Sequence, residues 1–304
     1  MSKITDLINE IVIDKNIESG KELCKSKIFK FDWNISCEHY EIVNESQVKL
    51  YNKPKGVYDL ISLGDVLYLS NEEKEYISQI LFKRLSKILK VNKSDKILVV
   101  GLGNRHISSD SLGVNVVRGI NITFESKSFP KVMAICPSVM GLTGIETSNI
   151  VDGVIDKVRP NILILIDSLC ASNISRLGRS IQITNNGICP GSGIGNNRKC
   201  IGNNFKGKII SIGVPLLIYA STFITNTFNE YGIDFTKINS IMQDAKKTCN
   251  MEEINSFITN VKNVYLANLD NTIVSIKDIS ECVETLSQII SSAVNKVLGV
   301  DSIK

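Results

Sequence analysis

Short apolar runs alternate with segments of helical periodicity through the middle of this chain. Runs of four to six apolar residues occur in KILVVGLG, KVMAIC, NILILID and GKIISIG, as expected for strands buried on both faces. Apolar residues recur at helical spacing in SLGVNVVRGI and GIETSNIVDGVIDKVR, and Pro215 is expected to open another helix, PLLIYASTFITNTF. The pattern predicts an α/β fold: a mainly parallel sheet flanked by helices, with GRSIQIT as an antiparallel or edge strand.

Two long amphipathic helices are predicted outside these strands. Ser70 and Glu73 form a capping-box pattern before a run of apolar residues at helical spacing. Near the C-terminus, SIKDISECVETLSQIISSAVNKVLG carries one apolar face, with Ser275 and Asp278 as its expected N-terminal cap and Gly299 as its end. This last helix is expected to dock on the core.

The first 60 or so residues are less regular, and only short pieces such as HYEIVN and VYDLISL suit strands. The chain has no internal repeat and no evident linker. We therefore expect one α/β domain with its core at about 95–232, an N-terminal arm and a helical C-terminal part.

Composition narrows the possible functions. The 35 basic and 31 acidic residues leave a net charge of +4 and form no long basic run, which disfavours direct contact with nucleic acid or membrane. No apolar stretch suits a secretory signal or a membrane span, so a cytoplasmic protein is predicted. Eight cysteines without a C-x-x-C pair favour reduced thiols.

The loop GLGNRHISSDSLG, after the first core strand, only partly matches a dinucleotide-binding motif. Gly101 and Gly103 fit G-x-G-x-x-G, but His106 stands where the third glycine belongs. The chain also lacks the P-loop motif G-x-x-x-x-G-K-[ST]. Nucleotide binding is therefore disfavoured, and no cofactor is predicted.

Two aspartates follow apolar strands: Asp110 lies in the loop after KILVVG, and Asp167 ends NILILID. If the strands are neighbours, both acids face one cleft at the carboxyl edge of the sheet. Two carboxylates in a partly dry cleft share a proton, so one activates water while the other polarises a carbonyl, which is the chemistry of amide hydrolysis. Two alternatives stay open: each acid caps a helix, or the pair binds a divalent metal with His106 as third ligand.

A second candidate region is NNGICPGSGIGNNRK, residues 185–199. Gly191, Ser192, Gly193 and Gly195 are predicted to contact substrate, because a glycine-rich backbone lets its N–H groups approach a ligand. A surface loop is the alternative. The surroundings of Ser192 do not match G-x-S-x-G, which disfavours a serine nucleophile.

Several motifs occur in the same order in the germination proteases of spore-forming Firmicutes: VVGLGN, SSDSLG, PSVMGLTGIETSNI, ILIDSL, GICPGSGIGNNRK and IISIGVP. The chain resembles that family most over residues 95–220. The resemblance implies an endopeptidase of the forespore or spore core that degrades small acid-soluble spore proteins at germination. It also implies an atypical aspartic peptidase without cofactor or metal, on a fold similar to the hydrogenase-maturation proteases, with Asp110 and Asp167 as the catalytic pair.

The family resemblance further implies a homotetramer made as a zymogen that removes its own propeptide. Residues 1–17 would be the propeptide, cut near Ile17 and Glu18, and residues 18–304 the peptidase domain. A metal-dependent hydrolase of the same fold and a catalytically inactive binding or regulatory paralogue are the alternatives.

Four positions depart from the family pattern while both aspartates remain. Ser138 lies where the family usually has PGVMG, and Cys189 replaces the histidine of GIHPGSG. Ser172 stands in place of a common arginine, and Tyr219 in place of a common aspartate. These changes surround the predicted cleft.

Overall fold

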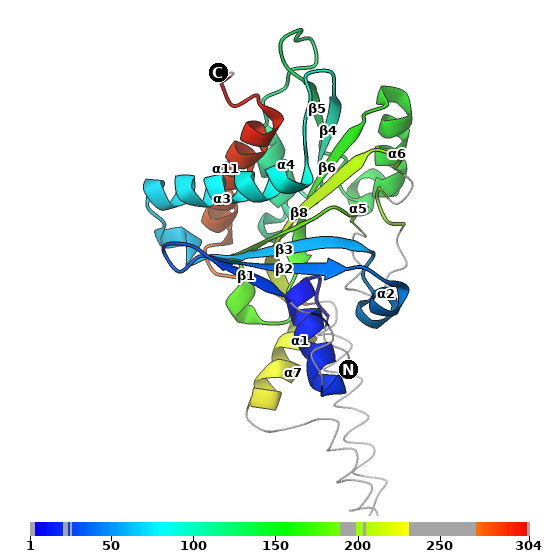
Figure 1. Ribbon diagram of the computed structural model, residues 1–304. Helices are drawn as coiled ribbons and strands as arrows, with labels where there is room; N and C mark the ends of the chain where they lie inside the picture. The colour runs from blue at the N-terminus through cyan, green and yellow to red at the C-terminus, as the bar shows by residue number, and fades with distance from the viewer. Residues whose placement is uncertain are drawn as a thin grey trace, which may run out of the picture.

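The computed structural model describes residues 4–20, 24, 26–188, 199–202, 205–230 and 272–302. These residues form an α/β fold, as predicted, around one mixed sheet (Figure 1). The strand order is β1-β2-β3-β7-β8-β6-β4-β5, and β9 pairs with β8. The likeness to hydrogenase-maturation proteases stays a prediction.

The parallel half of the sheet consists of the apolar runs recognised in the sequence. Alternate residues of these strands face two apolar cores, one beneath α3, α4 and α11 and the other beneath α6. Helices therefore cover both faces, as expected (Figure 1). The elements are β4 (Lys96–Gly101), β5 (Lys131–Ile135), β6 (Ile162–Cys170), β8 (Lys208–Tyr219), α3 (Asn71–Ile88), α4 (Leu112–Arg118), α6 (Thr147–Val158) and α11 (Ile279–Leu298).

The other half of the sheet is antiparallel and comes largely from the N-terminal part of the chain. HYEIVN and VYDLISL contribute to strands, as their composition suggests, and GRSIQIT provides an antiparallel strand that joins the two halves. Two helices without a clear apolar stripe were not predicted. The elements are α1 (Ile8–Ser19), β1 (Lys27–Lys30), β2 (Ser36–Ile42), α2 (Glu45–Tyr51), β3 (Gly56–Ser62) and β7 (Ser180–Thr184).

The helix expected at Pro215 is wrong. Strand β8 continues through Pro215 to Tyr219, and α7 (Ala220–Glu230) begins only afterwards. Pairing of β8 with β7 stops at Gly213, and the Pro215 carbonyl oxygen accepts a hydrogen bond from the Gly178 N–H (2.8 Å). Proline is tolerated at this position because the hydrogen-bond ladder between β8 and β7 has already ended, although β8 still pairs with β6 there.

The predicted helix ends are mostly confirmed. Ser70 and Glu73 form both hydrogen bonds of the capping box, and Gly299 ends α11 in the left-handed conformation (φ 66°). The cap expected from Ser275 is wrong, because its hydroxyl donates instead to the Leu216 carbonyl oxygen (2.6 Å).

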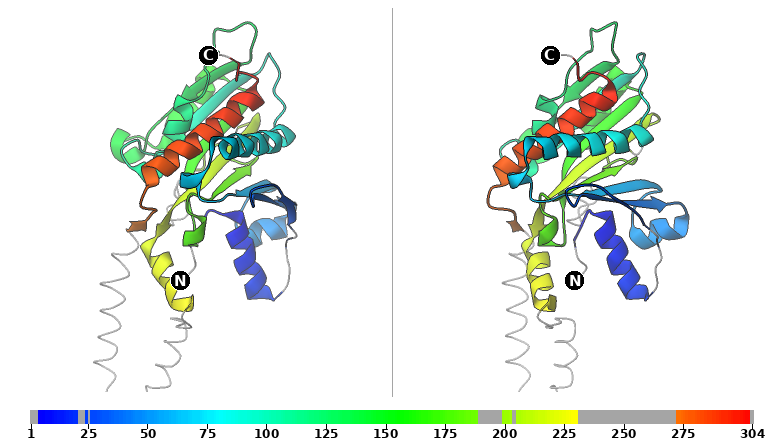
Figure 2. Two further views of the ribbon diagram at one scale, coloured as in Figure 1. Left: turned by 90° about the vertical axis from the view of Figure 1, so that its left-hand side faces the viewer. Right: turned by 60° about the vertical axis from the view of Figure 1, so that its left-hand side comes forward.

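Short elements complete the described fold: η1 (Val66–Tyr68), η2 (Ser108–Asp110), α5 (Met140–Thr143), η3 (Ile174–Arg176) and β9 (Ile273–Val274). Helices α1 and α7 project from the same end of the molecule (Figure 2). Among the described residues, no helix is both long and apolar enough to cross a bilayer.

Candidate active site

The glycine-containing loop after β4 packs around Asp110. The Leu102 N–H donates to the Ile166 carbonyl oxygen (2.8 Å), which holds the start of the loop against β6. Gly103 has φ 105°, and a Cβ there would lie 2.0 Å from the Asp110 carbonyl oxygen. Glycine is thus required by the close approach of two backbone segments. The loop is a platform for Asp110.

Asp110 is the last residue of η2 and is held by the backbone of its own loop. The Asn104 N–H donates both to the Asp110 carbonyl oxygen (2.8 Å) and to its Oδ2 (2.9 Å). Burial raises the pKa of Asp110 to about 6, although the Asn104 N–H opposes this shift. The N-cap of α4 is Ser111, so Asp110 is not its cap.

Asp167 lies inside β6, three residues before the strand ends at Cys170, whereas the sequence suggested that it ends the strand. Its partner on β8 is Gly213, and only 9% of the residue is exposed. The Ser168 N–H donates to Oδ1 at 2.9 Å. The pKa of Asp167 is raised well above its ordinary value, first by burial, then by the negative charges of Asp110 and Asp6. The two aspartates thus lie close enough to share one electrostatic site.

The N-terminal arm also reaches this site, through Asp6 and Glu10, two acids that the sequence did not single out. The Asp6 N–H donates to the Cys170 carbonyl oxygen, and the Cys170 N–H donates to Asp6 Oδ2, both at 2.9 Å. Glu10 accepts hydrogen bonds from the Ser172 N–H (2.7 Å) and the Asn173 N–H (3.0 Å). No sequence pattern marks Asp6 and Glu10 as site residues, because the residues that they contact are more than 150 positions away.

The glycine-rich segment predicted to contact substrate cannot be placed. Gly191, Ser192, Gly193 and Gly195 lie outside the described residues, as does Cys189.

His106 is exposed on the Asp110 loop, and its backbone N–H donates to Asn104 Oδ1 (2.9 Å). In the described part of the chain, no group of three or more His, Cys, Asp or Glu side chains is arranged to hold a metal ion.

Three of the departures from the family pattern can be placed. Ser138 has φ 66°, a left-handed conformation that favours glycine. Ser172 is buried, and its N–H contacts Glu10. Tyr219 lies near the end of β8, opposite Ile273.

The expectation that the cysteines are reduced holds for five described residues and is wrong for Cys200, which is disulfide-bonded.

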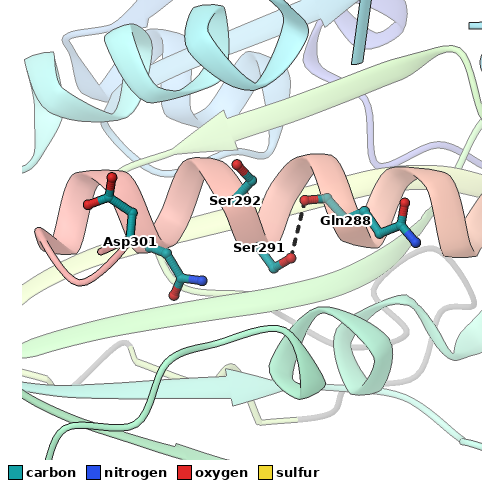
Figure 3. A pocket seen from close by; sticks show the side chains of 5 residues that line it. Gln288, Ser291, Ser292 and Asp301 are labelled. Atoms are coloured by element: carbon teal, nitrogen blue, oxygen red, sulfur yellow. Dashed lines mark hydrogen bonds between the residues drawn. The ribbon is translucent and has the colours of Figure 1, made fainter. Parts of the chain in front are cut away.

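A separate polar hollow lies along the C-terminal half of α11 (Figure 3). Its lining residues are Gln288, Ser291, Ser292, Asn295 and Asp301. Neither Asp110 nor Asp167 lines it, so the hollow is distinct from the acidic site.

Comparison with known proteins identifies the family of this chain. The family model described as germination protease matches residues 30–252. A germination protease of Clostridium tetani is 34% identical, with 98% of this chain and 96% of that protein covered. Those of Clostridium acetobutylicum (33% identical; 85% and 83% covered) and Caldanaerobacter subterraneus subsp. tengcongensis (34% identical; 87% and 85% covered) are similar too. The chain belongs to the germination protease family.

Proposed function

We propose that this protein is an aspartic-type endopeptidase that degrades small acid-soluble spore proteins during germination, in the forespore or spore core. Family membership supports a peptidase of spore germination. The observation that carries the aspartic mechanism is the pair of half-buried Asp110 and buried Asp167, whose pKa values are both raised. Perturbed acids in one site are typical of acid–base catalysis.

In the proposed reaction, Asp167 is the protonated member, because it is the more deeply buried and feels the charge of Asp110. Ionised Asp110 takes a proton from water as the water oxygen attacks the peptide carbonyl carbon, and Asp167 gives its proton to the carbonyl oxygen. Asp110 then protonates the leaving amine while Asp167 recovers a proton from the tetrahedral intermediate. The C–N bond breaks and both acids return to their initial states.

The N-terminal arm is proposed to keep the enzyme latent, with residues 1–17 as propeptide and residues 18–304 as the peptidase domain of a homotetramer. The Asp6 and Glu10 carboxylates accept hydrogen bonds from backbone N–H groups after Asp167, and these contacts support this role because an arm held there excludes a substrate chain. Ile17, beside the proposed cut, is 74% exposed and lies in the last turn of α1, which must unwind before the bond after Ile17 can be cut.

The test is digestion of a purified small acid-soluble spore protein by the full chain and by a chain lacking residues 1–17, with Asp110→Asn and Asp167→Asn as controls. We expect faster cleavage by the shortened chain and none by either variant. Equal rates with and without residues 1–17 would contradict latency. A folded wild-type chain that binds the substrate without cutting it would instead identify a binding or regulatory paralogue.

A further inference from the structure

Gln182 lies on the same face of the sheet as Asp167, across one intervening strand. Gly213 of β8 is the register partner of both residues. Their neighbours Ile166 and Ile183 belong to the core beneath α3 and α11, so alternation along each strand directs Asp167 and Gln182 to the opposite face. Gln182 is buried, with 7% of its surface exposed. A buried amide therefore lies in the same row of the sheet as the proposed catalytic acid.

Both ends of this amide hold the main chain of the arm. Gln182 Oε1 accepts a hydrogen bond from the Ile8 N–H (2.8 Å), and Nε2 donates to the Asp6 carbonyl oxygen (3.2 Å). Leu7, between them, has extended backbone (φ −79°, ψ 127°). In an extended chain, the carbonyl of one residue and the N–H of the second residue after it point to the same side. One glutamine thus contacts main-chain atoms without reading any side chain.

Asp6 also makes a backbone contact with the end of β6. The Asp6 N–H donates to the Cys170 carbonyl oxygen (2.9 Å), only three residues beyond Asp167. Between the two contacts, the Leu7 side chain is fully buried in an apolar cluster that includes Leu60 and Leu169. Main-chain atoms of Asp6 and Ile8 are thus held next to Asp167, on either side of the extended residue Leu7 and where helix α1 begins.

We propose that Gln182 is a substrate-positioning residue: once the arm leaves, its amide takes the carbonyl and the N–H of an extended substrate chain, as it takes those of Asp6 and Ile8. This inference builds on the proposed peptidase function and names how the same site recognises its substrate. Main-chain recognition of this kind suits unfolded polypeptides of varied sequence. In sequence terms, Gln182 is the polar residue between two buried isoleucines in SIQIT.

The test displaces the arm in the full chain by Leu7→Asp, which introduces a charge into the apolar cluster. If that variant does not fold, judged by circular dichroism and urea unfolding, Asp6→Ala with Glu10→Ala removes the arm's carboxylate contacts instead. Into this background we introduce Gln182→Met, which keeps the length of the side chain and removes its amide. Gln79→Met, at an exposed position on α3, is the matched control.

The first readout is binding of a peptide with the sequence of residues 4–12, ITDLINEIV, with or without a methyl group on the Ile8 nitrogen. Methylation should weaken binding about tenfold when Gln182 is present, as expected for loss of a buried hydrogen bond, and should have no further effect in Gln182→Met. An equal effect of methylation in both proteins would overturn the proposal.

The second readout is steady-state cleavage of a small acid-soluble spore protein. Gln182→Met should raise KM about tenfold and leave kcat within about twofold, whereas Gln79→Met should change neither. A KM unchanged by Gln182→Met in an active enzyme would overturn the proposal. If peptide binding depends on Gln182 but no protein is cleaved, main-chain binding by Gln182 is supported and the proposed peptidase function fails.

Discussion

Two buried acidic sites, one in each half of the sheet, are built in opposite ways. In the antiparallel half, Asp59 of β3 accepts hydrogen bonds from Arg84 Nε (2.8 Å) and Nη2 (2.7 Å), and His39 Nδ1 lies 2.6 Å from Oδ1. In the parallel half, the described contacts of Asp110 and Asp167 are with backbone N–H groups, and each acid lies near the other's charge. One site pairs its acid with the guanidinium of Arg84, and the other brings two acids together.

This difference separates an acid that stabilises the fold from acids suited to chemistry. The ion pair of Asp59 and Arg84 links the two elements that hold it, β3 and α3. Two neighbouring buried carboxylates resist ionisation together, so a proton passes between them and a substrate at moderate pH. Mutations in the two sites should therefore differ in their effects on activity and on stability.

Activity should distinguish the two sites most strongly. Asp110→Asn and Asp167→Asn should each lower kcat by about a thousandfold or more, because each removes one proton-transfer group. Asp59→Asn should leave kcat within about tenfold when measured on folded protein. Initial rates on a small acid-soluble spore protein provide the comparison, and a large loss of kcat in Asp59→Asn alone would reverse the assignment.

Stability should respond in the opposite order. Asp59→Asn should lower the free energy of unfolding by about 3–5 kcal/mol, because it leaves Arg84 buried without its charged partner. Asp156→Asn, at an exposed position on α6, is the control and should change it by no more than about 0.5 kcal/mol. Urea unfolding at neutral pH measures both, and equal effects would show that the ion pair contributes little.

Asp110→Asn should instead stabilise the protein at neutral pH, by about 1–3 kcal/mol. The folded-state pKa of about 6 exceeds the ordinary value of 3.8, so the folded protein binds this proton more tightly than the unfolded chain. The wild type therefore loses stability as pH rises toward about 6, and the advantage of the variant should be absent at about pH 4 and constant above about pH 7. Urea unfolding across this range is the measurement; a gain that is already complete at pH 4 would rule out titration of Asp110 as its cause.

A smaller effect is expected at Ser138, between β5 and α5. Ser138→Gly should raise the free energy of unfolding by about 0.5–1 kcal/mol, because glycine adopts the observed φ of 66° without steric cost. Ser128→Gly, at an exposed position whose φ is not in the left-handed region, should give no gain. Thermal unfolding measures the stability of both variants. No gain in Ser138→Gly over Ser128→Gly would contradict backbone strain at Ser138.

The parallel strands and the capping box at Ser70 were predictable because their signals are local: buried strands are apolar throughout, and caps have fixed spacing. Asp110 and Asp167 stood out as acids after apolar runs. The helix predicted at Pro215 was wrong because proline is common at helix starts, whereas here its position depends on where pairing between β7 and β8 ends. That end is set by contacts between distant parts of the sequence. The arm contacts of Gln182 join residues more than 170 positions apart, and no periodicity in either segment encodes them.

The measurement that tests the paired-acid mechanism most directly is the initial rate of spore-protein cleavage with and without a metal chelator, for the wild type, Asp110→Asn and Asp167→Asn. If the two acids act without a metal, the wild-type rate is unchanged by the chelator and both variants are inactive in either condition. Cleavage that stops with chelator and returns on adding a divalent metal would contradict that mechanism, and would make the two aspartates metal ligands.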